Sequence, residues 1–571
     1  MSKIFKNHHR GLTVSLMVVF LTGLLLGCDG VRVTHYFERG ALATAAPIAT
    51  GVGETVFARG GNACDAAVAV GFALAVVHPE AGNIGGGGFA LIHDGASGEV
   101  RALDFRETAP AAATEKMYLD KNDEVIENLS TFGAKAAGVP GTVAGFYRLW
   151  EEYGTMPWEE LVTIAAALAD TGYYIDAYMA ESFEEHKKAL TSFASTAEIF
   201  YPDGRALKTG ERLFQKDLSR TLYLIAAEGP DGFYKGQVAE SLVKTMTEHG
   251  GLISLEDLEN YSPVWREPIH FIFDSLDIYS MPPPSSGGIV MGQILKLIEP
   301  YDFSARTPAT PEYIHLFCEA SRLAFADRAT HLGDADFYPV PDGLLDESYL
   351  QQRRSLIIEK HASSSAETRP GSFGPANESE ETTHFSICDR DGNMVSITYT
   401  LNTAYGSKLV VEGGGFLLNN EMDDFSIKPG VANTYGLVGG EANKIEPGKR
   451  MLSSMSPTLV LRKDRPYLAL GSPGGSKIIT VVAQTIVNCT RFGLTPVDAA
   501  GQPRFHHQWL PDQIYLEEGG FDINTKQGLI SYGHNIQERT PYSDLQMVFV
   551  DNDGLMYGVA DPRKRGSAGG Y

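Results

Sequence analysis

The stretch ESEETTHFSICDRDGNMVSITYT, residues 378–400, decides the fold, because a polar segment ends in it and two strand-forming runs begin. The runs TTHFSICD and MVSITYTL flank a turn centred near Asp391 and Gly392, a pattern that predicts an antiparallel hairpin. Its register places Thr382 opposite Thr400. Two threonines are therefore expected to meet at the open end of the hairpin.

The segment before this hairpin, residues 361–381, lacks apolar periodicity and is expected to be a flexible linker. A threonine hydroxyl needs a base, and an N-terminal threonine carries one in its own α-amino group. That amine would exist only after the Glu381–Thr382 bond is broken. The junction therefore suggests a self-cleaving precursor, although most Thr-Thr pairs simply begin strands.

The remaining patterns predict a layered α+β protein with further hairpins and helices. The glycine run GNIGGGGFALIHD, 82–94, lacks the Lys-Ser/Thr of a phosphate-binding loop, so tight backbone packing is expected there. The run MSPTLVLRKDRPYLALGSPGG predicts a second hairpin at 455–475. Helices are predicted within 60–77, after an Asn62 cap, and at 158–170, 238–250, 288–298, 312–332 and 476–490.

Composition limits the classes of function that the protein can have. The chain has 571 residues, of which 43% are hydrophobic and 21% charged, which is typical of a globular protein with a large core. Its length alone favours three or four domains. The formal net charge of −24 argues against binding nucleic acid or anionic membranes through a general basic surface.

The first residues resemble a secretory signal, because three basic residues precede the apolar run GLTVSLMVVFLTGLLLG, 11–27. The tetrad Leu25–Cys28 resembles a bacterial lipobox, which implies removal of 1–27 and lipidation of Cys28. The alternative is an uncleaved signal anchor, and either way the body of the chain lies outside the cytoplasm. The scattered cysteines, Cys64, Cys318, Cys388 and Cys489, are expected to be buried free thiols, with a disulfide as the alternative.

Seven motifs in this order resemble the γ-glutamyltranspeptidase, or glutathione hydrolase, family from about Arg39 to the C-terminal SAGGY. They are LDFRETAP (103–110), TTHFS (382–386), TYTLNTAYGS (398–407), LLNNEMDDFS (417–426), RMLSSMSPT (450–458), GSPGGSKIIT (471–480) and PRFHHQWLPD (503–512). The resemblance implies the four-layer αββα sandwich of N-terminal-nucleophile hydrolases. A large subunit, 28–381, and a small subunit, 382–571, would then form a heterodimer with one core, in place of three or four domains.

A γ-glutamyl donor presents an α-carboxylate, an α-ammonium and a γ-amide, so its pocket needs a cation, anions and an oxyanion site. The resemblance assigns these tasks to residues of this chain. It implies Thr382 as nucleophile, Thr400 as its hydrogen-bond partner, Gly474 and Gly475 as oxyanion hole, Arg106, Ser453 and Ser454 for the carboxylate, Asn402, Glu421 and Asp424 for the ammonium, and Tyr435 in a lid at 428–443. Outside the family, Arg106 would be read as a surface residue paired to Asp104 or Glu107.

The implied reaction passes the γ-glutamyl group of glutathione or a similar donor to Thr382, and then to water or to the amine of an amino acid or dipeptide. It requires no metal and no organic cofactor, and no nucleic-acid partner is expected. His384, His506 and His507 are not expected to act as bases, because a self-activating threonine needs no histidine, and the pair His506 and His507 is expected to satisfy core hydrogen bonds. The implied location is the bacterial cell envelope, facing the periplasm, with lipid on Cys28 or without an anchor.

Three other functions remain open at this point. Two are relatives of the same superfamily, a cephalosporin (glutaryl) acylase and a poly-γ-glutamate-processing enzyme. The acylase is disfavoured because a glutaryl group has no ammonium for Asn402, Glu421 and Asp424 to bind. The third is a catalytically inactive, lipid-anchored binding protein, which the presence of Thr382 and the two glycines disfavours.

Overall fold

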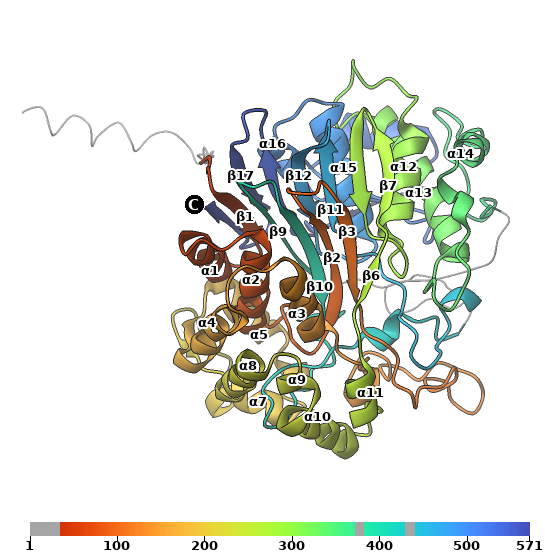
Figure 1. Ribbon diagram of the computed structural model, residues 1–571. Coiled ribbons are helices and arrows are strands. Elements are labelled where there is room, and N and C mark those ends of the chain that lie inside the picture. Colours follow the sequence, from red (N-terminus) through yellow and green to blue (C-terminus); the bar gives the residue numbers. More distant parts are fainter. Residues whose placement is uncertain (1–34, 372–381, 429–439) are drawn as a thin grey trace, which may run out of the picture. The chain divides into compact units, whose positions relative to one another are not determined.

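Two antiparallel β-sheets pack face to face at the centre of the protein, in a computed structural model that describes residues 35–371, 382–428 and 440–571 (Figure 1). The first sheet has the order β18 (Ser567–Gly570), β1 (Gly40–Thr44), β9 (Thr383–Asp389), β10 (Met394–Thr400), β2 (Gly87–His93), β3 (Val100–Phe105) and β6 (Val264–Arg266). The second has the order β17 (Met556–Ala560), β16 (Gln546–Val550), β12 (Arg465–Gly471), β11 (Thr458–Arg462), β8 (Leu276–Ser280) and β7 (Ile269–Phe273).

Helices cover the outer face of each sheet, which completes the predicted αββα sandwich. The seven-stranded sheet is covered by α1 (Pro47–Ala58), α2 (Ala63–Val77) and α3 (Thr142–Tyr153). The other helices of this half lie behind these three: α4 (Trp158–Thr171), α5 (Ala177–Glu185), α6 (Lys187–Leu190), α7 (Ala194–Phe200), α8 (Lys216–Glu228), α9 (Asp231–Tyr234), α10 (Gly236–His249) and α11 (Leu255–Asn260). The six-stranded sheet is covered by α12 (Gly287–Ile298), α13 (Pro311–His331), α14 (Glu347–Arg354), α15 (Lys477–Thr490), α16 (Pro496–Gly501) and α17 (Ile523–Ser531).

Two small sheets lie outside this sandwich. One joins β4 (Tyr173–Tyr174) to β5 (Arg212–Leu213), and the other joins β13 (Phe505–His506), β14 (Ile514–Glu517) and β15 (Ile536–Arg539). Residues Tyr36–Tyr571 form a single compact unit, so the length-based expectation of three or four domains is wrong.

The predicted hairpin and its register are confirmed. Strand β9 pairs with β10 so that Thr383 faces Tyr399, and the same register continued by one residue sets Thr382 opposite Thr400. Gly392 has a φ of 86° at the turn, a conformation that favours glycine. Both strands are buried along their whole length, as expected for the centre of a sheet that is covered on both faces.

The two faces of this hairpin differ in chemistry. Apolar side chains such as Phe385 point toward the helices of the seven-stranded sheet. On the face between the sheets, His384 Nδ1 lies 2.8 Å from Thr398 Oγ1, and the Ser396 hydroxyl donates to the Leu470 carbonyl at 3.1 Å. These bonds explain why polar residues alternate with apolar ones in strands that are fully buried.

The four-glycine run packs tightly, as predicted. A Cβ atom on Gly86 would lie 2.0 Å from the Thr400 carbonyl oxygen, and one on Gly88 would lie 2.4 Å from the Thr398 carbonyl oxygen. Helix α2, which the Asn62 side chain caps as expected, lies on the same sheet with every residue buried. Close backbone approach, and not phosphate binding, therefore accounts for these glycines.

Other expectations are met in part. Cys64, Cys318, Cys388 and Cys489 are buried free thiols, so the disulfide alternative is wrong. Of the predicted linker, residues 361–371 lie against α13, where the Ser363 and Gly371 N–H groups donate to Glu319 and Asp327, while 372–381 lie outside the described residues.

The hairpin of β7 and β8 is among those that were not predicted. Strands β7 and β8 are joined at Asp274 and Ser275, whose φ angles of 49° and 64° form a tight turn. The alternating pattern of IHFIF and LDIYS is the signal for it.

The region before Tyr36 carries the predicted signal and Cys28, and both lie outside the described residues. Across the described ranges, no helix combines the length and the apolar character needed to cross a membrane.

The packing of Gly86 gives a stability test with a matched control. Gly86→Ala should lower the free energy of unfolding by about 1–3 kcal/mol, because its methyl group would meet backbone that cannot move aside. Gly51→Ala, in α1 with open space around it, should leave stability unchanged or raise it by about 0.5–1 kcal/mol. Thermal unfolding of both variants measures the difference. Equal stability would show that the Gly86 contact is not restrictive.

Candidate active site

The open end of the β9–β10 hairpin lies at a small cavity. Thr382, immediately before β9, is buried at 7% exposure and lines the cavity together with Thr400. The complete lining is Arg106, Thr382, Thr400, Asn402, Glu421, Asp424, Ser453, Ser454, Met455, Gly475 and Ile478. Nine of these residues were singled out from the sequence motifs, and the fold brings them together from segments far apart in the chain.

A buried ion-pair cluster forms one wall of the cavity. Arg106, directly after β3, is 1% exposed, so its reading as a surface residue is wrong. One guanidinium nitrogen lies 2.6 Å from Glu421 Oε2, and the other terminal nitrogen pairs with Asp424. Its Nε donates to the Met451 carbonyl at 3.3 Å. A single cation therefore lies between two carboxylates inside the cavity.

A third acid, Glu107, lies behind this wall and was not assigned from the sequence. Its Oε2 is 3.7 Å from Arg106, and neither carboxylate oxygen has a hydrogen-bond partner among the described residues. Burial raises the pKa of Glu107 and of Glu421 to about 8 each, while the charge of Arg106 opposes the rise and neighbouring carboxylates add to it. The only sequence signal for Glu107 was an acid beside Arg106 after an apolar strand.

The serine wall is supported by a loop from the first part of the chain. The Ser453 N–H donates to the Pro284 carbonyl at 2.8 Å, and the Ser286 N–H donates to the Ser453 carbonyl at 2.7 Å. The Ser285 hydroxyl donates to the Met455 carbonyl at 2.7 Å. The PPPSSGG segment, 282–288, therefore fixes the backbone that presents Ser453 and Ser454.

Asn402 is held in position by its neighbours. Its backbone has a φ of 77°, a left-handed conformation that Asn tolerates better than most residues. The Asn402 N–H donates to Thr400 Oγ1 at 2.8 Å, and the side-chain amide donates to the Asn420 carbonyl at 3.0 Å. The oxygen of this amide is the hydrogen-bond acceptor of the Asn402 side chain.

The glycine pair lies at the start of a long helix. Gly474 and Gly475 have φ angles of 126° and 57°, and α15 begins two residues later at Lys477. Gly475 lines the cavity, whereas Gly474 lies beside it, where a Cβ atom would come within 2.4 Å of Ser543 Oγ. The amino end of a helix carries a partial positive charge, which suits a developing oxyanion.

The histidines that could be mistaken for bases occupy other positions. His384 lies between Thr398 and Ser386, and burial lowers its pKa to about 3. His506 Nδ1 lies 2.8 Å from Thr480 Oγ1, and His507 accepts the Trp509 N–H. None of the three lines the cavity, and the prediction that His506 and His507 make core hydrogen bonds is confirmed.

Two lining residues, Met455 and Ile478, were not singled out, although each lies inside a quoted motif. Glu381 and Tyr435 lie outside the described residues. The described arrangement can hold a group with one negative and one positive charge against the Arg106 cluster, with a carbonyl between the Thr382 hydroxyl and the glycine pair. That combination suits acyl transfer from an amino-acid-like donor.

Comparisons with known proteins agree with this chemistry. A family described as gamma-glutamyltranspeptidase matches residues 49–571. The chain is 45% identical over 528 residues to the glutathione hydrolase proenzyme of Escherichia coli (strain K12), covering 92% of this chain and 90% of the relative.

Solved structures show the same architecture. The cephalosporin acylase from Bacillus halodurans has a TM-score of 0.85 at 27% identity, covering 95% of this chain and 97% of that chain. The γ-glutamyltranspeptidase of Helicobacter pylori has a TM-score of 0.57 at 45% identity, covering 57% of this chain and 94% of that chain. The acylase shares the fold at lower identity, and the match over 49–571 shows that the chain belongs to the γ-glutamyltranspeptidase family of N-terminal-nucleophile hydrolases.

Proposed function

We propose that this protein is a γ-glutamyltransferase and glutathione hydrolase whose precursor cuts itself between Glu381 and Thr382, giving the chains 28–381 and 382–571. The observation that carries the proposal is the cavity that Thr382 shares with the ion-paired Arg106, Glu421 and Asp424. This wall offers one guanidinium and two carboxylates to a donor with an α-carboxylate and an α-ammonium.

Donor binding follows from an exchange of ion pairs. The carboxylate of the donor would pair with the guanidinium of Arg106 and accept hydrogen bonds from the hydroxyls of Ser453 and Ser454. Its ammonium would pair with Glu421 and Asp424 and donate to the Asn402 oxygen. Because the donor brings both charges, every buried charge keeps an opposite partner when the direct pairs separate. A buried charge left alone would cost several kcal/mol.

The reaction uses the Thr382 hydroxyl as nucleophile and its freed α-amine as base, which has an ordinary pKa of about 8. The hydroxyl attacks the γ-carbonyl, Gly474 and Gly475 N–H groups receive the oxyanion, and the leaving amine takes the proton. A γ-glutamyl ester of Thr382 remains. Water releases glutamate from it, or an amino-acid or peptide amine takes the γ-glutamyl group. Thr400 orients the nucleophile from the facing strand.

Maturation would use the same hydroxyl on a different carbonyl. Thr382 Oγ1 attacks the carbonyl carbon of Glu381, the amide becomes an ester by an N-to-O shift, and water hydrolyses the ester. The products are a carboxylate on Glu381 and the amine that the later reaction needs. In the mature enzyme, segment 428–443 with Tyr435 would cover the donor.

A glutaryl acylase is the second candidate, because the fold resembles a cephalosporin acylase over 95% of this chain. A glutaryl group has no ammonium, so it would separate Arg106 from Glu421 and Asp424 without offering them a new cation. Rates with γ-glutamyl-p-nitroanilide and with a glutaryl amide of the same amine distinguish the two activities. Faster turnover of the glutaryl amide would reject the γ-glutamyl assignment.

Thr382→Ala should remain a full-length, folded and inactive precursor, because both steps lose their nucleophile. Thr382→Ser keeps the hydroxyl and loses the methyl group that restricts its rotamer, so it should mature more slowly and retain some activity. Gel analysis of subunits and turnover of γ-glutamyl-p-nitroanilide measure the two steps. Two subunits or wild-type turnover in the alanine variant would exclude the mechanism.

Arg106→Ala should weaken donor binding by about 2–5 kcal/mol, because a buried charge-assisted pair is lost. It also leaves Glu421 and Asp424 without their cation. Arg106→Lys retains the charge but not the two parallel N–H groups, so its loss should be smaller. Apparent donor affinity is the readout, with subunit formation as the folding control. Unchanged affinity in both variants would remove Arg106 from the donor site.

L-glutamate, which is the hydrolysis product, should inhibit less strongly as the pH falls from 8 to 7. Glu421 has a raised pKa of about 8, so its carboxylate form declines over this range, by about fivefold for a simple titration. Glu421→Gln does not titrate and should flatten the dependence of the inhibition constant on pH. Glu107→Gln removes a carboxylate that raises the pKa of Glu421 and should therefore lower that pKa. The change in the inhibition constant should then occur at lower pH. An unaltered profile in Glu421→Gln would contradict the assignment.

The envelope location rests on the lipobox-like Leu25–Cys28, which supports lipidation of Cys28 and an anchor facing the periplasm. Cys28→Ala should abolish lipidation and the signal cleavage that depends on it. Intact mass and membrane fractionation test this. The same mature mass and membrane association as the wild type would leave Cys28 without this role.

A further inference from the structure

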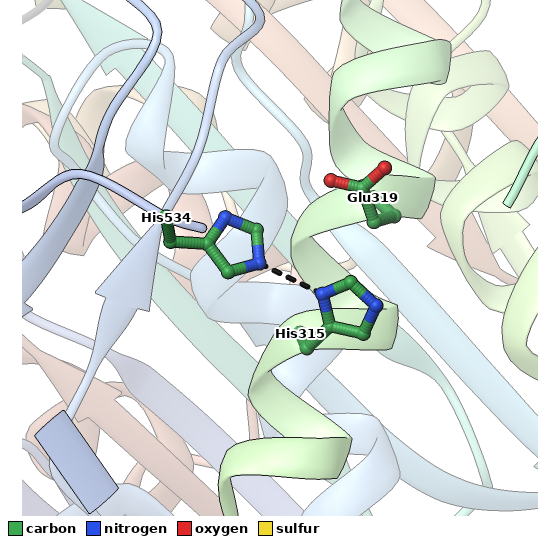
Figure 2. A group of neighbouring side chains, drawn as sticks. All are labelled: His315, Glu319 and His534. Carbon is green, nitrogen blue, oxygen red and sulfur yellow. Dashed lines mark hydrogen bonds between the residues drawn. The ribbon is translucent and has the colours of Figure 1, made fainter. Parts of the chain in front are cut away.

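Two histidines and one glutamate meet away from the Thr382 cavity. His315 and Glu319 lie one turn apart on α13, and His534 follows α17 (Figure 2). One potential ligand atom from each lies within 4.8 Å of the others, and all three residues are buried. None of them lines the cavity of Thr382.

Hydrogen bonds fix which ring nitrogens carry lone pairs. His315 Nε2 faces the Ile358 carbonyl at 3.0 Å and therefore carries a proton. In the neutral ring, His315 Nδ1 is then an acceptor, and it lies 2.8 Å from His534 Nε2. A backbone carbonyl that holds the far nitrogen of an imidazole is the usual way in which a metal-binding histidine is oriented.

The charges around the three residues favour a cation. Glu319 accepts from the Ser363 N–H at 3.1 Å and pairs with Arg322 at 3.2 Å, and Arg322 also pairs with Asp512. Two carboxylates thus face one guanidinium, which leaves one negative charge in excess. Ile358 and Ser363, whose backbone groups contact His315 and Glu319, also line a groove of about 890 Å³.

We propose that His315 Nδ1, His534 Nε2 and the Glu319 carboxylate bind one Zn²⁺ ion, with water completing the coordination. Two imidazoles and a carboxylate are a zinc ligand set, whereas Ca²⁺ and Mg²⁺ prefer oxygen ligands alone. A tetrahedral ion places its ligand atoms about 3.3 Å apart. The two rings would therefore separate slightly and Glu319 would move inward. The His534 proton moves to Nδ1 of the same ring, so both rings stay neutral.

The ion would have a structural role. His315 and Glu319 precede the proposed cut and His534 follows it, so in the mature enzyme the ion would link the two chains. This linking rests on the proposed function, whereas the binding site itself does not. The uncut Thr382→Ala precursor should therefore bind the ion as the wild type does, which separates a failure of this site from a failure of maturation.

The test is titration of chelator-treated full-length protein with Co²⁺, a spectroscopic substitute for Zn²⁺. The wild type and Thr382→Ala should each take up one equivalent and show the visible absorption of four- or five-coordinate Co²⁺. His534→Gln and Glu319→Gln should lose it, while His270→Gln, which changes an exposed histidine, should not. Zn²⁺ should raise the thermal midpoint of the wild type with concentration, but not that of the two ligand variants.

X-ray absorption of the Zn²⁺-loaded wild type gives a result that does not depend on folding of the variants. It should show two imidazole ligands. No saturable uptake by the wild type, unchanged uptake in both ligand variants, or a shell of oxygen atoms without imidazole would each overturn the site.

Discussion

The pairing of β9 with β10 is the constraint on which the rest of the structure depends. It sets Thr382 opposite Thr400 at one end, and it forms the centre of the seven-stranded sheet. A slip of one residue would turn the Phe385 side chain toward the hydrogen-bonding groups between the sheets. It would also turn the His384 side chain toward the apolar side chains of the covering helices. The hydrophobic core therefore fixes the position of the proposed nucleophile to within a single register.

The proposed donor site places charged groups in the protein interior, where burial favours neutral groups. Arg106 and three acids are buried together, and the raised pKa values of Glu107 and Glu421 show that burial disfavours their charged forms. A cluster of this kind contributes little to stability compared with apolar packing. In the proposed function, it provides a set of charges that a donor carrying both signs would join without leaving a charge alone.

Local sequence patterns predicted six of the helices and the β9–β10 and β11–β12 hairpins, because hairpin turns, helix caps and glycine packing are decided by neighbouring residues. The β9–β10 register and the cap of α2 needed nothing more. Met455 and Ile478 carried no local signal that separates them from the rest of their motifs, since their place in the cavity comes from packing against distant segments. The ordered part of the linker was missed for the same reason. Its backbone is held by side chains of α13, such as Glu319 and Asp327, and not by a periodic apolar face.

The sheet order also determines what a cut before Thr382 can do. Strands from before that residue pair with strands from after it at four places: β1 with β18, β1 with β9, β2 with β10, and β8 with β11. Breaking one peptide bond leaves all four ladders intact, so the two proposed chains would stay joined in one core. The β9–β10 ladder, which joins two strands of the second proposed chain, places Thr382 beside Thr400. The cavity around Thr382 is lined by residues that follow strands of both sheets, Arg106 after β3 and Gly475 after β12, so the proposed self-cleavage would come after folding of the whole precursor.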